Sequence, residues 1–384
     1  MANHSRKEAS RVGIKWTEKE KKALLATKGE EQSIIEFQTA YRPECSIASL
    51  GRMFRQLRQE KHGGSVNQKE LMKLLKNKQV SLDELADHFS VPPKEIERAI
   101  KELRKQNILV DSFGESFQLA KAIAPVEEHH VIDFKKHKEK EFCFGAIADT
   151  HLGSKYERLD VLNCLYDRFQ SYGVETVFLG GNMIEGEARF NKYDIYVMGV
   201  EDQVRNFVEK FPQRKGIKTK FVTGDDHEGW YVQREHIDIG KVIIDRAKEF
   251  GRDDLEYLGH MERDIEFKQK GGCSTLRVIH AGGGSSYAIS YTSQKYVETL
   301  QGGEKPSIVI AGHFHKLSHE YPREVHVIQP GCTQDQTPFM RKRRIQAMVG
   351  GVVMWVKQND IGIFTSVKTE FLPFYDKKFY QYHW

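Results

Sequence analysis

Acidic, amide and imidazole side chains follow five separate apolar segments in the C-terminal two thirds of the chain. The segments are FCFGAIA, VETVFLGG, TKFVTGD, TLRVI and PSIVIAG. The side chains that follow them are those of Asp149, His151, Asn182, Asp226, His227, His280, His313 and His315. Carboxylate, amide and imidazole groups in this mixture are ligands for two divalent metal ions. A single such histidine is more often an ordinary hydrogen-bonded residue, but five placements together favour a metal site.

The apolar segments are predicted strands, and amphipathic helical patterns separate the first of them, at 158–173, 200–213 and 241–251. This alternation predicts an α/β domain over residues 142–384. The later predicted strands have fewer helices between them, which favours a mixed α/β (α+β) sandwich of two sheets. Because ligands bind beyond the carboxyl ends of strands in such sheets, we expect the polar loops to meet in one crevice.

The order of these blocks resembles the calcineurin-like metallophosphoesterase superfamily, whose signature runs DxH, GDxxxx, GNH(D/E), H and GHxH. The matching segments are Asp149-Thr150-His151, Gly181-Asn182, Gly224-Asp225-Asp226-His227-Glu228, His280 and Gly312-His313-Phe314-His315. The resemblance covers roughly residues 142–335 and implies a two-sheet fold flanked by helices. Within this superfamily, the double-strand-break repair nucleases are the closest functional analogy.

The resemblance also implies a role for each residue. Asp149, His151 and His315 would hold the first ion, Asp226, His280 and His313 the second, and Asn182 stands at the position that bridges both. Two cations about 3.5–4 Å apart clamp the phosphoryl oxygens and lower the pKa of a water molecule between them. His227 would act catalytically, by protonating the leaving oxygen or steadying charge on the phosphate.

The donor set suits Mn²⁺, Zn²⁺ or iron, and Mg²⁺ is a further alternative. Mn²⁺ is the first choice for a nuclease, by analogy with the family.

Two positions depart from the family pattern. Asp226 stands where the family has asparagine, and a carboxylate there still binds a metal. Asn182 stands where the family has the bridging aspartate, and a neutral amide does not bridge two dications as a carboxylate does. We therefore expect loss of one metal or a large fall in rate. The explanations are a deliberate substitution, a naturally impaired protein, or replacement of the carboxylate by Glu185; the otherwise intact site favours the first.

Residues 1–62 show three apolar helical patterns, and the first opens at Thr17 with Glu20 in capping-box spacing. The segment resembles a Myb-like helix-turn-helix, with a basic third helix that carries Arg52, Arg55 and Arg58 on one face. A small packing bundle is nearly as good an interpretation. If the unit binds DNA, these arginines are its expected contacts.

Residues 63–122 read as three helices followed by a hairpin around Phe113-Gly114. This order resembles a winged helix-turn-helix domain, in which the third helix enters the major groove of DNA. The expected contacts on that helix are Lys94, Arg98, Lys101, Arg104 and Lys105. Winged helices also bind proteins, so the order of elements favours DNA by about two to one.

Residues 123–141 are charged and strand-poor, and are predicted to be a linker. The net charge of +5 lies wholly in residues 1–141, which hold 27 Lys+Arg against 22 Asp+Glu. This excess is weak evidence for a polyanionic partner, and an ordinary basic surface explains it equally well. No apolar run reaches the roughly 18 residues of a membrane helix, and the first residues do not form a signal peptide.

Five cysteines without CxxC spacing indicate reduced thiols. Together these features predict a cytoplasmic protein of a bacterium or a bacteriophage-infected cell, either monomer or homodimer.

The combined interpretation is a metal-dependent DNA endonuclease, with site-selective nicking as a sub-hypothesis. A small-molecule phosphatase or phosphodiesterase with a regulatory winged helix is the rival, and a non-catalytic DNA-binding protein is the third possibility. Three further segments have open interpretations. The glycine-rich segment 282–286 either lets a phosphate approach the metals or is a flexible loop. The basic run 341–344 either binds the nucleic-acid backbone or is a surface loop. The aromatic tail 371–384 either packs against its own domain or stacks on bases.

Overall fold

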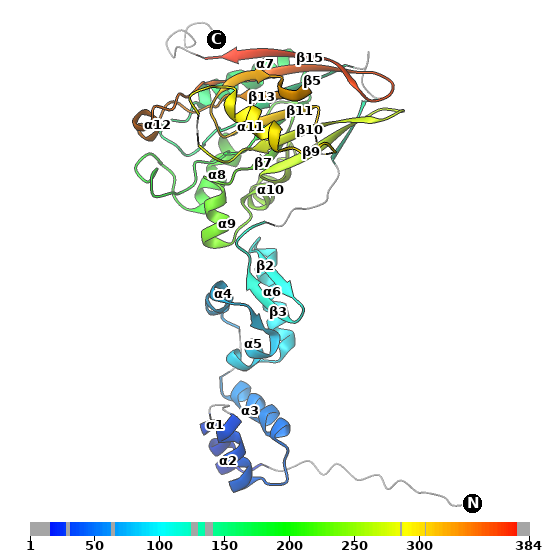
Figure 1. Ribbon diagram of the computed structural model, residues 1–384. Helices are drawn as coiled ribbons and strands as arrows, with labels where there is room; N and C mark the ends of the chain where they lie inside the picture. Colours follow the sequence, from blue (N-terminus) through cyan, green and yellow to red (C-terminus); the bar gives the residue numbers. More distant parts are fainter. Residues whose placement is uncertain are drawn as a thin grey trace, which may run out of the picture. The chain divides into compact units, whose positions relative to one another are not determined.

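The computed structural model describes residues 16–27, 31–62, 66–123, 130–134, 141–284, 286–303 and 305–374. The chain divides into two compact units (Figure 1). One unit comprises Met1–Gln106 and Val110–Leu119, and the other comprises Asn107–Leu109 and Ala120–Trp384. Residues 63–65, at the start of the second predicted domain, lie outside the described residues.

Three helices open the first unit, as the apolar patterns predict: α1 (Glu18–Ala26), α2 (Glu31–Tyr41) and α3 (Ile47–His62). The predicted capping box is confirmed, since the Thr17 amide donates to the Glu20 carboxylate over 2.7 Å and the Glu20 amide donates to Thr17 Oγ1. Such a box satisfies amides that lack a partner within the helix. Leu24, Phe37 and Leu50 form the centre of a small apolar core between these helices.

The rest of the first unit contains α4 (Gln68–Asn77), β1 (Val80–Ser81), α5 (Leu82–Phe89), α6 (Pro93–Lys105), β2 (Val110–Phe113) and β3 (Ser116–Leu119). The predicted order of three helices and a hairpin is confirmed. A short strand that the sequence pattern does not reveal, β1, pairs with β3 and completes a three-stranded sheet. The predicted apolar stripe of α6 is buried at Ile96, Ile100 and Leu103.

The second unit contains two six-stranded sheets within its described residues. The first sheet runs β15 (Phe364–Pro373), β14 (Gly350–Gln358), β5 (Glu141–Ile147), β6 (Thr176–Gly180), β7 (Lys218–Thr223) and β8 (Leu255–His260). The second runs β12 (Leu317–Glu320), β13 (His326–Pro330), β11 (Ile308–Gly312), β10 (Cys273–His280), β9 (Glu262–Lys268) and β4 (His130–Asp133). Strands β5 to β8 are parallel, as are β10, β11 and β13.

The α-helices described in the second unit are α7 (Leu159–Ser171), α8 (Val200–Lys210), α9 (Gly229–Glu235), α10 (Ile239–Glu249), α11 (Tyr291–Thr299) and α12 (Pro338–Arg343). Of these, α7, α8 and α10 pack on the first sheet and α11 packs on the second. The period-two pattern of strand residues explains the layers. Val352 and Met354 of β14 face the core between the sheets, whereas Val353 between them joins the core under α7, α8 and α10. On the far side, Val297 of α11 packs on the second sheet. The predicted mixed α/β sandwich flanked by helices is confirmed.

The predicted linker at 123–141 contains a strand, so the expectation of a strand-poor segment is wrong for its middle. Strand β4 pairs in parallel with β9, and Phe134 directly after it is fully buried in the core between the sheets. The surrounding lysines dominate the composition and conceal the short pattern HVIDF. Residues 124–129 and 135–140 of this segment lie outside the described residues.

The basic run at 341–344 is also not the loop considered from the sequence. Pro338 begins α12, which Thr337 caps by accepting the Met340 amide, and three of the four basic residues lie within this helix. In the aromatic tail, residues 371–373 continue β15 and Phe374 is buried. Residues 375–384 lie outside the described residues.

Candidate metal centre

The carboxyl ends of five strands from both sheets bring the predicted site residues together. Asp149 and His151 follow β5, Asn182 follows β6, Asp226 and His227 follow β7, His280 ends β10, and His313 and His315 follow β11. Two glycines let the two sheets approach at this edge, because a Cβ on Gly312 would collide with the carbonyl oxygen of Gly180. The parallel strands of each sheet therefore deliver their loops to one place.

Five of these residues adopt left-handed backbone conformations. Their φ angles are +53° at Asp149, +47° at His151, +51° at Asn182, +85° at His313 and +52° at His315. Such conformations cost about 1–3 kcal/mol each in non-glycine residues and cluster at functional sites. Hydrogen bonds between the loops hold them, including Asp149 N to Gly181 O at 3.0 Å and His151 N to Asn182 O at 2.9 Å.

A first group of donor atoms consists of Asp149, His151 and His315, whose ligand atoms all lie within 4.8 Å of one another. Nε2 of His151 lies 3.2 Å from Nε2 of His315. Oδ1 of Asp149 lies 3.4 Å from Nε2 of His315 and 3.7 Å from Nε2 of His151. All three side chains are buried, so their charges are shielded from water.

A second group consists of Asp226, His280 and His313, again with ligand atoms within 4.8 Å of one another. Oδ1 of Asp226 lies 3.1 Å from Nε2 of His280, and its Oδ2 lies 3.3 Å from Nδ1 of His313. The two groups are linked, because the His313 amide donates to Oδ2 of Asp149 over 2.8 Å.

Backbone carbonyls fix which nitrogen of each ring carries a proton. A carbonyl oxygen can only accept, so Nδ1 of His280 donates to Gly180 over 2.7 Å and Nε2 of His313 donates to Gly283 over 2.7 Å. In both rings the other nitrogen faces the carboxylate of Asp226. Metal-binding histidines are oriented in this way, with the distal N–H held by an acceptor and the lone pair turned toward the ion.

Glu185 holds the ring of His151 in the same manner. Its Oε2 lies 2.9 Å from Nδ1 of His151, on the opposite side of the ring from the nitrogen that faces His315. Gln334 and Asn191 donate to the two oxygens of this carboxylate over 2.8 and 3.1 Å. Glu185 is therefore placed to orient His151. Its carboxylate also forms a third group of possible ligand atoms, with His151 and His227.

Asn182 lies between the two groups. Its Nδ2 donates to Oδ1 of Asp149 over 3.3 Å, which joins it to the first group. Its Oδ1 lies close to Gly224 and His280, because a Cβ added to Gly224 would collide with this oxygen and would lie 3.0 Å from Nε2 of His280. Oδ1 itself is buried and has no hydrogen-bond partner. An unsatisfied buried oxygen is costly, and a cation beside it would satisfy it. The donor set, the ring orientations and this oxygen fit a pair of divalent cations.

His227 lies beside the first group without joining Asp149. Its Nδ1 donates to the Glu185 carbonyl over 2.7 Å, which leaves Nε2 as the nitrogen that can exchange a proton. Its ring contacts that of His151 edge to face at 4.4 Å, and its side chain is partly exposed. A histidine in this position can reach a substrate bound at the centre.

The pKa values describe a centre of paired charges. Burial raises the pKa of Asp149, but the charge on His315 and hydrogen bonds from the histidines outweigh burial and hold it well below its usual range. Burial lowers the pKa of His280, but the hydrogen bond and charge of Asp226 raise it to about 9. Burial, followed by the charge on His151, lowers the pKa of His227. Divalent cations would take the place of the imidazole protons, because metal binding requires neutral histidines.

The sequence interpretation missed the role of Glu228, which directly follows His227. Its buried carboxylate accepts the amides of Met183 and Gly224, each over 2.5 Å. It thereby ties the loop of Asn182 to the loop of Asp226. Burial, only partly offset by these hydrogen bonds, raises its pKa to about 7. The acidic residue at the end of the GDDHE segment is the signal that could have revealed it.

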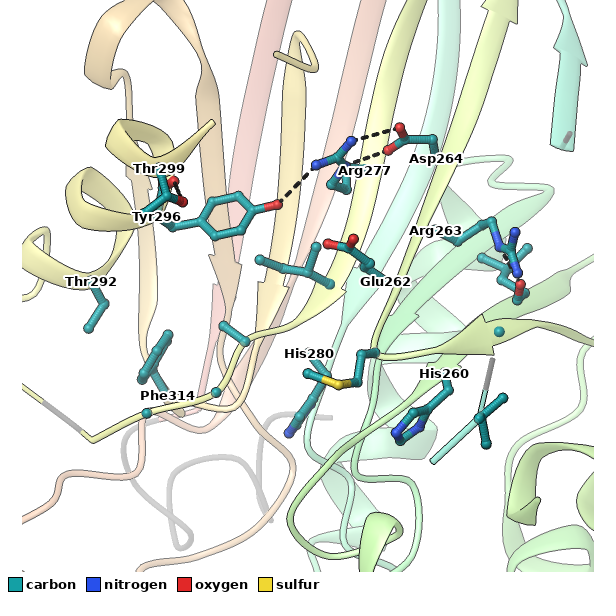
Figure 2. A pocket seen from close by; sticks show the side chains of 18 of the residues that line it. His260, Glu262, Arg263, Asp264, Arg277, His280, Thr292, Tyr296, Thr299 and Phe314 are labelled. Atoms are coloured by element: carbon teal, nitrogen blue, oxygen red, sulfur yellow. Dashed lines mark hydrogen bonds and ion pairs between the residues drawn. The ribbon is translucent and has the colours of Figure 1, made fainter. Parts of the chain in front are cut away.

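A large cavity adjoins the centre at His280. Its volume is about 1140 Å³, and it lies against β8, β9, β10 and α11 (Figure 2). Inside it, the Arg277 guanidinium forms two hydrogen bonds with Asp264, at 2.6 and 2.8 Å, and approaches the hydroxyl of Tyr296 (Figure 2). The lining has both signs of charge, with Lys241, Arg263, Arg277 and Lys295 against Asp238, Glu262, Asp264 and Glu266.

The residues predicted to bind DNA lie in the first unit. On α6, the side chains of Lys94, Arg98, Lys101, Arg104 and Lys105 are exposed, and so are the acidic side chains of Glu95 and Glu97. Two of these side chains already have partners. Arg104 donates to the Val110 carbonyl over 2.9 Å, and Lys105 pairs with Glu102 at 2.7 Å.

On α3, Arg52 is exposed and Arg55 pairs with Asp87 at 3.0 Å. The side chain of Arg58 lies outside the described residues. The contacts of these residues with DNA stay a prediction.

Among the described helices, none is both long enough and apolar enough to cross a bilayer.

No family model matches this chain, and no curated protein matches it. Solved structures that are similar include an archaeal phosphodiesterase, at 14% identity and a TM-score of 0.31, covering 60% of this chain and 100% of that one. Zinc-complexed Vps29 from Entamoeba histolytica matches at 14% identity and 0.29, covering 60% and 99%. GAP50 of Plasmodium matches at 12% identity and 0.37, covering 61% and 85%. The function proposed below is therefore drawn from the geometry of the site.

Proposed function

We propose that this chain is a metal-dependent phosphodiesterase that hydrolyses DNA, with one divalent cation at each of the two donor groups. Asp149, His151 and His315 would hold one cation, Asp226, His280 and His313 would hold the other, and Asn182 lies between them. Two such cations, when bound, polarise the phosphoryl oxygens and lower the pKa of a water molecule at the centre. Mn²⁺ is the proposed metal, with Zn²⁺, Mg²⁺ and iron as alternatives.

One observation carries the proposal. Nδ1 of His280, Nε2 of His313 and Nδ1 of His151 are each held by an acceptor outside the centre. The remaining nitrogens converge on carboxylates that are also buried or half-buried. Histidines that served only to pack or to form hydrogen bonds would have no reason to share this orientation.

The chain's own residues would do the rest of the chemistry. Nε2 of His227 would hold or supply the proton that the leaving oxygen needs, because its other nitrogen is committed to the Glu185 carbonyl. The loops carrying Asn182 and Asp226 keep their spacing through Glu228. Asn182 lacks the charge that a bridging carboxylate would supply, so the chain with Asn182 is proposed to be slow or inactive.

Two features support DNA as the substrate. The whole positive excess of the chain lies in residues 1–141, and α6 presents Lys94, Arg98 and Lys101 to solvent. Exposed cations on one helix attract phosphates without sequence preference. A DNA-binding unit fused to one active site would favour nicking of one strand. Choice of the site would require base contacts from α6 in the major groove.

The experiment compares the natural chain with Asn182→Asp on supercoiled plasmid and Mn²⁺, followed by mapping of the new ends. Open circles with a defined end, formed by Asn182→Asp and abolished when His280→Ala is added, are the expected result. An Asn182→Asp protein that hydrolyses neither plasmid nor a chromogenic phosphodiester would contradict the proposed activity and favour a non-catalytic DNA-binding protein.

A small-molecule phosphodiesterase is the second candidate, and the cavity beside His280 favours it. Its volume of about 1140 Å³ suffices for a small ligand, since such sites commonly have about 300–1000 Å³. Its mixed lining offers no general attraction for a polyanion. Turnover of a chromogenic phosphodiester with no nicking of plasmid would support this candidate over DNA.

A further inference from the structure

A row of ring contacts leads from the metal centre to the protein surface. His315 contacts His151 at 5.1 Å between ring centroids, and His151 contacts His227 at 4.4 Å. The ring of Phe190 then contacts His227 edge to face at 5.5 Å. The row therefore leaves the buried centre through the histidine that is proposed to exchange a proton.

The row ends in two exposed phenylalanines from distant parts of the chain. Phe190 follows the Asn182 loop, and Phe339 lies in α12, yet their centroids are 5.1 Å apart with an interplanar angle of 34°. Phe190 is 44% exposed and Phe339 is 37% exposed. Two adjacent exposed phenylalanine rings form an apolar patch, and such a patch is typical of a binding surface where polar residues surround it.

Cationic side chains lie close in sequence to this pair, on the two segments that carry it. Arg189 and Lys192 are exposed beside Phe190, and Arg341, Lys342, Arg343 and Arg344 are exposed in and after α12. The guanidinium of Arg343 lies 5.7 Å from the ring of Phe339. Nearby, Glu187 accepts the Gly199 amide and Asp335 pairs with Arg158, so these acids are already engaged.

We propose that Phe190 and Phe339 form a stacking platform for an unpaired nucleobase next to the scissile phosphate, with the surrounding arginines and lysines holding the strand's phosphates. This inference rests on the proposed phosphodiesterase function and narrows its substrate to single-stranded segments of nucleic acid. Aromatic rings interleaved with cations are the usual means of binding single strands, because every base has a face that can stack.

The platform selects unpaired bases for a geometric reason. The bases of an intact duplex stack on one another and present only their edges in the grooves. A base on Phe190 or Phe339 must therefore lie in a single strand, a flap or a locally opened site. The basic run 341–344, whose role the sequence leaves open, would then bind the phosphates of this strand.

The first experiment maps the base directly on the 384-residue chain with Asn182 in place. A single-stranded oligonucleotide with one 5-iododeoxyuridine is irradiated with the protein in EDTA, and the adducts are located by mass spectrometry. We expect an adduct on Phe190 or Phe339, and loss of that adduct in the Phe190→Ala, Phe339→Ala double variant. Adducts confined to residues 16–119, with none in residues 186–198 or 337–345, would overturn the proposal.

The second experiment separates stacking from charge. Affinity for a single-stranded oligonucleotide is compared with affinity for an abasic strand of equal length and charge. The chain with Asn182 should prefer the base-bearing strand at least about fivefold, because one stacked base contributes at least roughly that factor. The double alanine variant should lose the preference, while Phe339→Tyr keeps it. Phe250→Ala, another exposed phenylalanine, is the matched control and should leave the preference unchanged.

The proposal and the underlying function fail in different ways. Equal affinity of the natural chain for both strands contradicts the platform, even if Asn182→Asp hydrolyses phosphodiesters. A base-dependent adduct on the platform, with no hydrolysis by Asn182→Asp, contradicts the phosphodiesterase and keeps the platform as a nucleic-acid binding surface. Single-stranded RNA is the comparison arm, and adducts formed with RNA alone would overturn DNA as the strand.

Discussion

Nε2 of His151 and Nε2 of His315 lie 3.2 Å apart in a buried site, although 164 positions separate the two residues in the chain. Both nitrogens also lie within 3.7 Å of Oδ1 of Asp149. Two imidazoles whose Nε2 atoms face one carboxylate oxygen form a cluster that a divalent cation would complete by taking the place of the protons. The predictions below test this cluster, its neighbours and the fold that presents them.

Asn182→Asp should strengthen metal binding. A carboxylate at this position offers two charged oxygens to the two donor groups, where the amide offers one neutral oxygen that has no partner now. Calorimetric titration with Mn²⁺ should give two sites in the variant and fewer or weaker sites in the natural chain. His280→Ala should remove the second site, whereas His326→Ala, a histidine outside the centre, should not. Equal stoichiometry and affinity in the natural chain and the Asn182→Asp variant would refute this.

Glu185→Gln should weaken metal binding at the first group about 10- to 100-fold, which is typical for loss of a residue that orients a ligand. Gln334, Asn191 and His151 now face the two carboxylate oxygens of Glu185. The glutamine would replace one of these oxygens with an NH₂ group, which cannot accept a hydrogen bond from them. Titration with Mn²⁺ measures the affinity, and Glu209→Gln on the exposed face of α8 is the control. An affinity unchanged within twofold would mean that Glu185 does not hold His151.

Gly224→Ala should destabilise the fold, because its Cβ would collide with Oδ1 of Asn182 and the ring of His280. Overpacking of this kind costs roughly 1–3 kcal/mol. Gly302→Ala, where a Cβ would meet nothing within 4 Å, is the matched control. Urea denaturation of both variants measures the cost. Equal stability of the two would show that the Asn182 loop moves freely away from β7.

The stability of the second unit should fall in mild acid through His326. Burial, followed by the charge on His319, lowers the pKa of His326 to about 4, whereas an unfolded histidine titrates near 6.5. The unfolded chain therefore binds more protons between these values, and stability rises with pH across that window. Solvent access reduces the expected effect to about 1 kcal/mol between pH 7 and 5.

His326→Gln should remove that part of the pH dependence. Nδ1 of His326 lies 2.9 Å from Nε2 of His319, and the ring of His326 contacts that of Tyr321. The hydroxyl of Thr369 contacts the other nitrogen of His319. Urea denaturation at pH 7 and pH 5 gives the difference for the natural chain and the variant. An identical loss of stability in both would exclude His326 as its source.

Much of the fold was predictable, because the strands have plain periodicities. The run VVMWV in β14 is an example, because its residues alternate between the core that joins the two sheets and the core under the helices. The convergence of Asp149, Asn182 and His280 at one edge follows from the parallel direction of their strands. The short strand β4 could not be predicted, because its pairing with β9 depends on residues more than a hundred positions away.

The residues that support the site were harder to infer than its ligands. Glu185 and Glu228 act through hydrogen bonds that exist only once the loops after β5, β6 and β7 meet. The contact between Phe190 and Phe339 likewise joins segments with no common sequence pattern. Spacing alone identifies groups that bind metals, whereas orientation and surface juxtaposition require the folded chain.

Anomalous X-ray diffraction from crystals of the Asn182→Asp variant soaked in Mn²⁺ tests the central claim most directly. We predict two anomalous peaks about 3.5–4 Å apart, one beside Asp149, His151 and His315 and the other beside Asp226, His280 and His313. Well-ordered crystals without a peak at either group, at Mn²⁺ concentrations that saturate the titration, would contradict it.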